Sequence, residues 1–135
     1  MELRIYYSDT DCGGVVYYAN YLKYLEMART EFLRSRGINI ADLAQAGCLF
    51  VVSKAEINYK SPAVYNDTIS IETEILSVSN ASFNISYRIL RKSDSKLLVD
   101  AKTKMVSVGS NRSPVRLTQD LKKKLHALVQ PLESN

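Results

Sequence analysis

The hydrophobic pattern of this chain changes its period near residue 49, and that change constrains the fold more than any other feature. From about residue 17 to residue 36, apolar side chains recur at intervals of three and four, which predicts a long, deeply packed helix. The stripe on this helix consists of Tyr21, Leu25, Ala28 and Phe32. Gly37 follows directly and is a natural helix stop. One central helix is therefore expected to precede a sheet.

After residue 49, apolar residues alternate with polar ones, as they do in half-buried strands. Strands are predicted at residues 1–8, 49–60, 67–78, 82–90 and 96–109, with short helices at 40–47 and 118–129. Tight turns between the last three strands indicate an antiparallel meander. The predicted class is therefore α+β, with one antiparallel sheet of about five strands wrapped around one long helix.

The length and composition indicate one globular domain. The 135 residues suffice for a sizeable core, and no linker or repeat divides them. Hydrophobic residues make up 46% of the chain and charged residues 24%, which excludes a disordered protein. No apolar run approaches the roughly 20 residues of a membrane span, and the first residues do not resemble a signal peptide. We therefore expect a single domain, residues 1–135, in the cytoplasm.

The residue types limit the chemistry that this chain can perform. It has one histidine, His126, and two cysteines, Cys12 and Cys48. These counts exclude a multi-histidine metal site, and a histidine-dependent catalytic triad would have to use His126. We therefore expect no metal and no cofactor, with chemistry based mainly on carboxylates, hydroxyls and backbone amides. The net charge of +4 suits an anionic partner, but the run 122–124 is typical of a solvated helix face and does not indicate nucleic-acid binding.

The segment from Asp9 to Gly14 combines two carboxylates with two glycines, just before the predicted central helix. Unpaired backbone amides at a helix start carry positive partial charge and can hold a developing oxyanion. A carboxylate beside them can act as a nucleophile or as a base on a carbonyl compound. The alternative interpretation is that Asp9 or Asp11 merely caps the turn or the helix.

Two other kinds of site fit this segment less well. A calcium loop would match at Asp9, Asp11 and Gly14, but Asn20 stands where a bidentate Glu is needed, and a strand precedes the loop. Cys12 has no neighbouring base in the sequence that would activate it as a nucleophile.

The residues from Tyr6 to Leu33 resemble the signature of the hotdog-fold acyl-CoA thioesterases. The most similar group is the 4-hydroxybenzoyl-CoA thioesterase family, in its branch associated with the Tol–Pal system. The family pattern is Asp-x-Asp, a small or glycine pair, two aliphatic residues, and a Tyr or His before Asn-Tyr. In this chain the pattern is Asp9, Asp11, Gly13-Gly14, Val15-Val16, Tyr18 and Asn20-Tyr21. Residues 58–73 are similar to the family's middle segment, so that the resemblance covers nearly the whole chain.

The resemblance implies a hotdog fold and an acyl-CoA thioesterase that assembles into dimers, often tetramers, with an active site formed by both chains. It assigns the catalytic carboxylate to Asp11 and the amide that polarises the thioester carbonyl to the backbone of Tyr18. Asp9 and Gly14 then support the loop. The bacterial Tol–Pal branch usually has His at the position of Tyr18, although other members have Tyr.

The family binds coenzyme A through basic residues near subunit contacts. Where some relatives carry Arg and Lys before the third long strand, this chain has Ser79-Asn80-Ala81. Arg112 and Arg116, which precede the last helix, are therefore the candidates for contact with the coenzyme A phosphates.

The chemistry needs no histidine, because a thiolate is a stable leaving group. Asp11 could attack the thioester directly or deprotonate a water molecule, and the sequence does not choose between these routes. A non-catalytic hotdog module that binds an acyl ligand or a partner protein is the second hypothesis. A hotdog hydratase or dehydratase is disfavoured, because it would need a histidine near the central helix.

Overall fold

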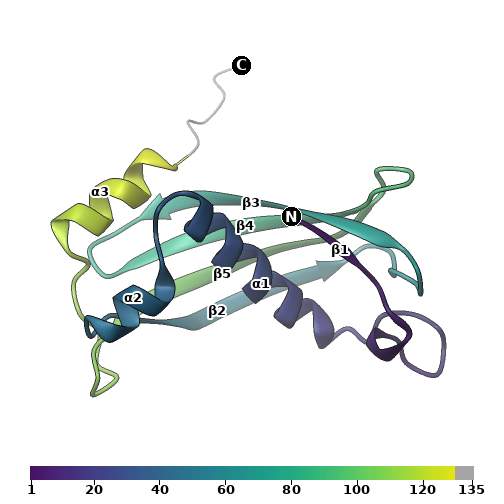
Figure 1. The fold of residues 1–135 in the computed structure, drawn as a ribbon, viewed down its shortest axis with the longest axis horizontal. Helices are drawn as coiled ribbons and strands as arrows, with labels where there is room; N and C mark the ends of the chain where they lie inside the picture. Colours follow the sequence, from purple (N-terminus) through teal and green to yellow (C-terminus); the bar gives the residue numbers. More distant parts are fainter. Residues whose placement is uncertain (130–135) are drawn as a thin grey trace.

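The structure, a computed structural model, describes residues 1–129 and consists of one curved sheet around one long helix (Figure 1). The strands are β1 (Glu2–Arg4), β2 (Leu49–Tyr59), β3 (Thr68–Val78), β4 (Ser82–Arg91) and β5 (Leu97–Val108). The helices are α1 (Asn20–Ser35), α2 (Ile40–Gln45) and α3 (Gln119–Ala127). All strand pairs are antiparallel, and the strand order is β1-β3-β4-β5-β2. The predicted fold class, including the β3-β4-β5 meander, is confirmed.

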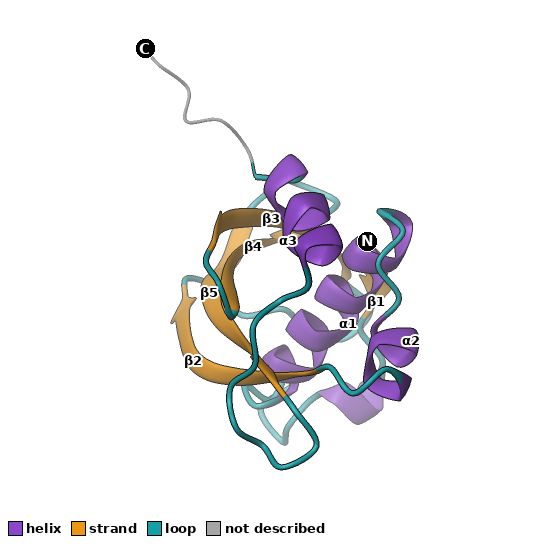
Figure 2. Cartoon of the chain, turned by 90° about the vertical axis from the view of Figure 1, so that its left-hand side faces the viewer, coloured by secondary structure: helices purple, strands orange, loops and turns teal. Residues whose placement is uncertain are grey.

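The sheet curls around α1, which lies in its concave side (Figure 2). The inner face is built from Ile69, Ile71 and Ile75 of β3, Phe83, Ile85, Tyr87 and Ile89 of β4, and Val99, Ala101, Thr103 and Met105 of β5. From α1, the buried side chains are Tyr21, Tyr24, Leu25, Ala28 and Leu33. The period-two and helical patterns of the sequence therefore identify the two surfaces that form the core.

The first strand is much shorter than the predicted residues 1–8, and the prediction was wrong there. The chain leaves the sheet at Tyr6, whose N–H donates to the Asp9 carboxylate at 2.9 Å. A 3-10 turn, Tyr7–Asp9, follows. Ile5 makes the last hydrogen bond to the β3 side, with its N–H donating to the Asp67 carbonyl oxygen at 2.8 Å, and the Asp9 carboxylate then holds the chain in the turn.

The central helix starts at Asn20 and not at the predicted residue 17. The Tyr17 N–H donates to the Asp9 carbonyl oxygen at 3.1 Å, which fixes the preceding residues in a loop. At the other end, Gly37 has a φ of 80° and follows the helix as predicted. Its N–H donates to the Arg34 carbonyl oxygen at 3.1 Å.

The two edges of the sheet differ in what covers them. Strand β2 forms one edge and is largely exposed. Its exposed large apolar side chains are Leu49, Val51, Val52 and Tyr59. On the other edge, β1 pairs only with residues 68–70 of β3, and Val129 forms a bridge with Ile75 farther along. Within residues 1–129, none of the helices has the length and apolar character that a membrane span requires.

Candidate active site

Residues 9–18 form a small hairpin that is fastened to the rest of the fold. The Asp11 N–H donates to the Val15 carbonyl oxygen at 2.9 Å, and Thr10 forms an antiparallel bridge with Val16. The Val16 N–H in turn donates to the Ala63 carbonyl oxygen at 2.9 Å. The predicted catalytic segment is therefore an ordered loop directly before α1.

Asp11 lies at the tip of this hairpin, and it is exposed. Its Oδ1 accepts a hydrogen bond from the Gly13 N–H at 2.8 Å, and its carbonyl oxygen accepts one from the Gly14 N–H at 3.0 Å. Gly14 has a φ of 79°, a conformation that glycine adopts without strain. These contacts orient the Asp11 carboxylate and leave Oδ2 without a hydrogen bond among residues 1–129.

The Tyr18 N–H makes no hydrogen bond to any residue from 1 to 129. It lies two residues before the first residue of α1, where the helix dipole is positive. The peptide that follows it is held by β2, because the Tyr59 hydroxyl donates to the Tyr18 carbonyl oxygen at 3.3 Å. Burial, and then the neighbouring Tyr18, raise the pKa of this hydroxyl, so that it remains a donor at neutral pH.

Asp9 connects the two parts of the loop. Its carbonyl oxygen accepts hydrogen bonds from the Tyr17 N–H at 3.1 Å and from the Asn20 side-chain amide at 3.0 Å. Its carboxylate accepts the Tyr6 N–H. The supporting role predicted for Asp9 is consistent with these contacts, since one residue joins the chain before the hairpin to the start of α1.

Tyrosine rings surround the helix start. Edge-to-face or tilted contacts, with ring centroids 5.2–5.9 Å apart, join Tyr17, Tyr18, Tyr21, Tyr24 and Tyr59. The Tyr21 hydroxyl also accepts the Ala63 N–H at 3.2 Å. Neither Tyr24 nor Tyr59 was predicted from the sequence to lie in this group. The helical spacing of tyrosines at 17, 21 and 24 was the available signal for Tyr24, whereas nothing local marks Tyr59.

A cavity of about 320 Å³ opens beside these rings. Its lining includes Val15, Val16, Tyr18, Tyr21, Tyr59 and Pro62. The walls are mainly apolar, and Tyr18, whose N–H has no partner among residues 1–129, is one of the lining residues. Asp11 is not among the lining residues, although it belongs to the same hairpin as Val15 and Val16. The cavity is therefore suited to an apolar group attached to a carbonyl at the helix start.

The loop between β5 and α3, which contains Arg112 and Arg116, lies at the opposite end of the molecule from the start of α1 (Figure 1). The length of strand β2 gives this separation. At one end of the strand, Tyr59 contacts Tyr18; at the other end, Leu49 pairs with Val108, just before the loop that contains Arg112 and Arg116 (the arginine loop). The ten steps from Leu49 to Tyr59, at ~3.3 Å each, span roughly 33 Å. Within one chain, the structure therefore brings Asp9, Asp11 and Tyr18 together but not Arg112 and Arg116.

A further cation, which was not predicted from the sequence, lies at this distant end. The Lys122 ammonium on α3 donates to the Asn80 side-chain oxygen at 2.7 Å. The Leu117 N–H donates to the Asn80 carbonyl oxygen at 2.8 Å, which brings the arginine loop to the same turn. The turn 79–81, which lacks basic residues of its own, thus has a lysine supplied by α3.

The remaining reactive side chains lie as follows. His126 is on the exposed face of α3, far from the hairpin. Cys12 is exposed beside Asp11, and Cys48 is half-buried with its sulfur 3.2 Å from the Ser107 hydroxyl. Among residues 1–129, no three His, Cys, Asp or Glu side chains are grouped as a metal site would require.

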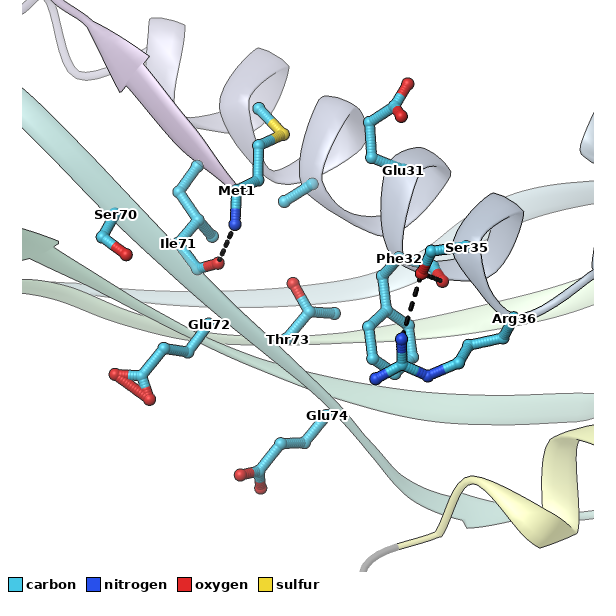
Figure 3. A pocket seen from close by; sticks show the side chains of 11 residues that line it. Met1, Glu31, Phe32, Ser35, Arg36, Ser70, Ile71, Glu72, Thr73 and Glu74 are labelled. Carbon is cyan, nitrogen blue, oxygen red and sulfur yellow. Dashed lines mark hydrogen bonds between the residues drawn. The ribbon is translucent and has the colours of Figure 1, made fainter.

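A second, larger cavity of about 690 Å³ lies between β3 and the C-terminal half of α1 (Figure 3). The Arg36 guanidinium stacks over the Phe32 ring in its wall, 4.7 Å from the centroid. None of its lining residues belongs to the hairpin. The larger of these two cavities is therefore not the one beside the predicted catalytic segment.

Comparison with known proteins agrees with this geometry. The sequence profile of the thioesterase-like superfamily matches residues 6–125. The chain belongs to this thioesterase-like superfamily. The acyl-CoA thioester hydrolase YbgC of Escherichia coli is 40% identical to this thioesterase-like chain over 106 residues, 78% of each protein. The acyl-CoA thioesterase YbgC of Haemophilus influenzae is 35% identical over 127 residues, 93% of each.

A solved structure gives the same result for the fold. The 1,4-dihydroxy-2-naphthoyl-CoA thioesterase Slr0204 from Synechocystis superposes with a TM-score of 0.86 at 25% identity, covering 97% of both chains. The predicted hotdog fold and the predicted enzyme class, a thioester hydrolase, are therefore confirmed for this thioesterase-like protein.

Proposed function

We propose that the protein is an acyl-CoA thioesterase, which hydrolyses an acyl-CoA to a free carboxylic acid and coenzyme A. The observation that carries this proposal is the position of an exposed, oriented carboxylate, Asp11, in the hairpin that ends at the unpaired Tyr18 amide. The acyl-CoA thioesterases among its relatives support the choice of substrate class.

In the proposed reaction the thioester carbonyl oxygen accepts a hydrogen bond from the Tyr18 N–H. That bond strengthens as negative charge develops on the oxygen, an effect of ~3 kcal/mol for a good donor. Two routes complete the reaction. The Asp11 carboxylate attacks the carbonyl carbon and expels the thiolate, and water then hydrolyses the mixed anhydride. Alternatively, Asp11 takes a proton from a water molecule that attacks the carbonyl carbon. In both routes the C–S bond breaks and the thiolate takes up a proton.

A second copy of the chain completes the proposed site. The roughly 33 Å between the hairpin and the arginine loop is too far for one chain to hold both ends of the substrate without a partner. The exposed apolar residues of edge strand β2 suit an interface with such a copy. We therefore infer a homodimer or homotetramer. In it, a substrate bound at the hairpin of one chain has its coenzyme A phosphates contacted by basic side chains of another chain, namely Arg112, Arg116 and also Lys122.

The test is a panel of aliphatic and aromatic acyl-CoA esters with detection of free thiol. Thiol release by the wild-type protein is expected for at least one ester, and the panel reports the preferred acyl group. Asp11→Asn should lower turnover at least a hundredfold with the fold intact, because the amide is neither nucleophilic nor basic. Asp9→Asn should be milder on turnover. Near-normal turnover by Asp11→Asn would instead leave Asp11 with a capping role only.

The second candidate is a non-catalytic hotdog module that binds an acyl ligand or a partner protein. Binding of acyl-CoA with no release of thiol from any ester would favour it. A Tol–Pal connection and a cytoplasmic location stay predictions from the sequence.

A further inference from the structure

Arg91, the last residue of β4, engages each of its three guanidinium nitrogens within the chain. Its Nε donates to the Asp67 carboxylate at 3.2 Å, and its two terminal nitrogens donate to the Pro62 carbonyl oxygen at 3.3 Å and to the Asp94 carboxylate at 3.0 Å. The Arg91 side chain is 21% exposed and that of Asp67 is 16% exposed. In every other ion pair within residues 1–129, at least one side chain is about half-exposed or more. Arg91 and Asp67 therefore form the most buried ion pair of the described chain.

Arg91 thereby holds residues 62–67, which lie between β2 and β3 and which we call the anchor loop. The loop also closes on itself, because the Val64 N–H donates to the Asp67 carboxylate at 3.0 Å and the Asp67 N–H donates to the Val64 carbonyl oxygen at 3.1 Å. Arg91 contacts both ends of this closed loop, Pro62 through its carbonyl oxygen and Asp67 through its carboxylate. One guanidinium thus fixes the loop to the end of β4.

The reactive hairpin rests on the same anchor loop. The Val16 N–H donates to the Ala63 carbonyl oxygen at 2.9 Å, and Val15 forms an antiparallel bridge with Val64. The Ala63 N–H donates to the hydroxyl of Tyr21, in the first turn of α1, at 3.2 Å. The anchor loop therefore joins the hairpin to the helix start.

Both proposed reacting groups depend on this attachment. The Asp11 N–H donates to the Val15 carbonyl oxygen, and the Tyr18 amide lies two residues after Val16. Pro62, whose carbonyl oxygen accepts from Arg91, also lines the 320 Å³ cavity beside the Tyr18 amide. A shift of the anchor loop would therefore change the position of the carboxylate, the amide donor and the cavity wall.

We propose that Arg91 is a positioning residue, which fixes the anchor loop against the hairpin and so places Asp11 and the Tyr18 amide for thioester hydrolysis. This inference rests on the proposed thioesterase function. Arg91 contacts neither reacting group, and acts through Asp67 and the Pro62 carbonyl oxygen. Misplacement by about 1 Å, caused by a remote substitution, can cost about a hundredfold in rate. Arginine suits this role because its rigid, planar fork holds a carboxylate and a carbonyl oxygen in fixed relative positions.

Arg91→Ala tests the proposal at a temperature well below the melting temperature of the variant. We expect kcat on the best acyl-CoA of the panel to fall about tenfold, with KM changed less than about twofold. A short thioester without the nucleotide should show the same loss, because positioning does not depend on the phosphates. Arg91→Lys keeps the charge but offers one nitrogen in place of three, so it should lower kcat about threefold.

Two control variants should keep the wild-type kcat. Arg88→Ala removes an arginine of the same strand, whose pair with Glu72, at 3.7 Å, is exposed and away from the anchor loop. Asp94→Asn weakens the third contact of Arg91, which does not involve the anchor loop.

A merely structural arginine would lower the melting temperature and leave the kcat of the folded variant unchanged. Wild-type kcat in folded Arg91→Ala would therefore overturn the proposal, and wild-type kcat in Arg91→Lys would do so if the alanine variant does not fold. A loss that appears only in the KM for acyl-CoA, and not with the short thioester, would make Arg91 a phosphate contact and would also overturn it.

A double-mutant cycle identifies the residue through which Arg91 acts. In an Asp67→Asn background, Arg91→Ala should lower kcat less than about threefold, because the ion pair has already been broken. Fully additive effects on kcat would overturn the proposal. All these contrary results leave the proposed function intact, whereas both proposals are wrong if the wild-type protein releases no thiol from any ester.

Discussion

The Tyr59 hydroxyl at the end of β2 donates a hydrogen bond to the carbonyl oxygen of Tyr18, at 3.3 Å. The two residues are 41 positions apart, and their rings also meet edge-to-face, with the centroids 5.9 Å apart. An exposed edge strand is thereby joined to the residue that supplies the proposed oxyanion donor. These two contacts connect the edge of the sheet to the loop before α1.

Tyr59→Phe should lower kcat about fivefold on the preferred acyl-CoA, because one hydrogen bond worth ~1 kcal/mol no longer holds the peptide after the donor amide. Steady-state kinetics would measure this loss. Tyr65→Phe is the matched control: its ring is also half-exposed, and its hydroxyl makes no hydrogen bond in residues 1–129. Equal rates for the two variants would contradict a role for the Tyr59 hydroxyl.

The two glycines of the hairpin should respond differently to substitution by alanine. A Cβ on Gly13 would lie 3.2 Å from Asp11 Oδ1, so Gly13→Ala should displace the carboxylate and lower kcat about tenfold with little loss of stability. A Cβ on Gly14 meets no atom within 4 Å, but the φ of 79° is strained for alanine. Gly14→Ala should therefore lower the melting temperature by about 4 °C, for ~1 kcal/mol of strain. Calorimetry and kinetics on both variants would reveal the pattern, and a reversed pattern would rule out this geometry.

Arg116→Ala should raise the KM for acyl-CoA with little change in kcat, because phosphate contacts act mainly on ground-state binding. Hydrolysis of a short thioester without the nucleotide should be unaffected. Arg34→Ala serves as the control, since this exposed arginine pairs with Glu31 at the far end of α1. Equal losses on both substrates would assign Arg116 to the fold or to the chemistry.

Mixing tests whether the arginine acts across a subunit interface. A mixture of Arg116→Ala and Asp11→Asn proteins, refolded together, should recover activity with a low KM, because one mixed site then combines an intact Asp11 with an intact Arg116. No recovery would show that both residues act within one chain.

Solution mass tests the predicted oligomer. Light scattering should give at least twice the chain mass of 15.2 kDa at micromolar concentration. Replacement of Val51 and Val52 by lysine should shift the mass toward the monomer, because charge on an edge strand opposes pairing. Leu76→Lys, at another exposed apolar position, should not. A wild-type monomer would contradict both the oligomer and the shared site.

Stability should fall in alkaline solution. Burial raises the pKa values of Tyr21, Tyr24 and Tyr87 above 10.0, the value expected for an unfolded chain. Below that pH both states keep these protons, and above it the unfolded chain releases protons that the native protein retains. The free energy of unfolding in urea should therefore be flat from about pH 7 to 9 and decrease above about pH 10. Tyrosinate absorbance that reaches the value for all nine tyrosines while the protein is still folded would indicate that the three hydroxyls are accessible.

The sequence was sufficient to predict the helices and strands whose buried faces give a regular spacing of apolar residues. The alternation at Ile69, Ile71 and Ile75 and the stripe from Tyr21 to Ala28 predicted the sheet face and the helix face that form the core. The Asp9–Gly14 segment could be predicted as a loop before a helix, because carboxylates, glycines and a helix start are local signals.

Long-range contacts were beyond such local signals. The pairing of Tyr59 with Tyr18 depends on the register of β2 against β5, which no residue near either tyrosine encodes. The same holds for the placement of Lys122 at the turn beside Asn80. The early end of β1 coincides with the turn at Tyr7–Asp9, which the Asp9 carboxylate holds through the Tyr6 N–H, and alternation alone does not reveal such a turn.

The amino end of the chain has a practical consequence for anyone who attaches a tag or a reporter to it. The Met1 amine donates to the Ile71 carbonyl oxygen at 3.2 Å, and the Met1 carbonyl oxygen accepts the Ile71 N–H at 2.8 Å. In the antiparallel register, added residues would run past Glu72, Thr73 and Glu74 into the cavity of Figure 3. A fusion at this end would lengthen β1 as an extra stretch of edge strand, and it would be held by the fold as part of the sheet.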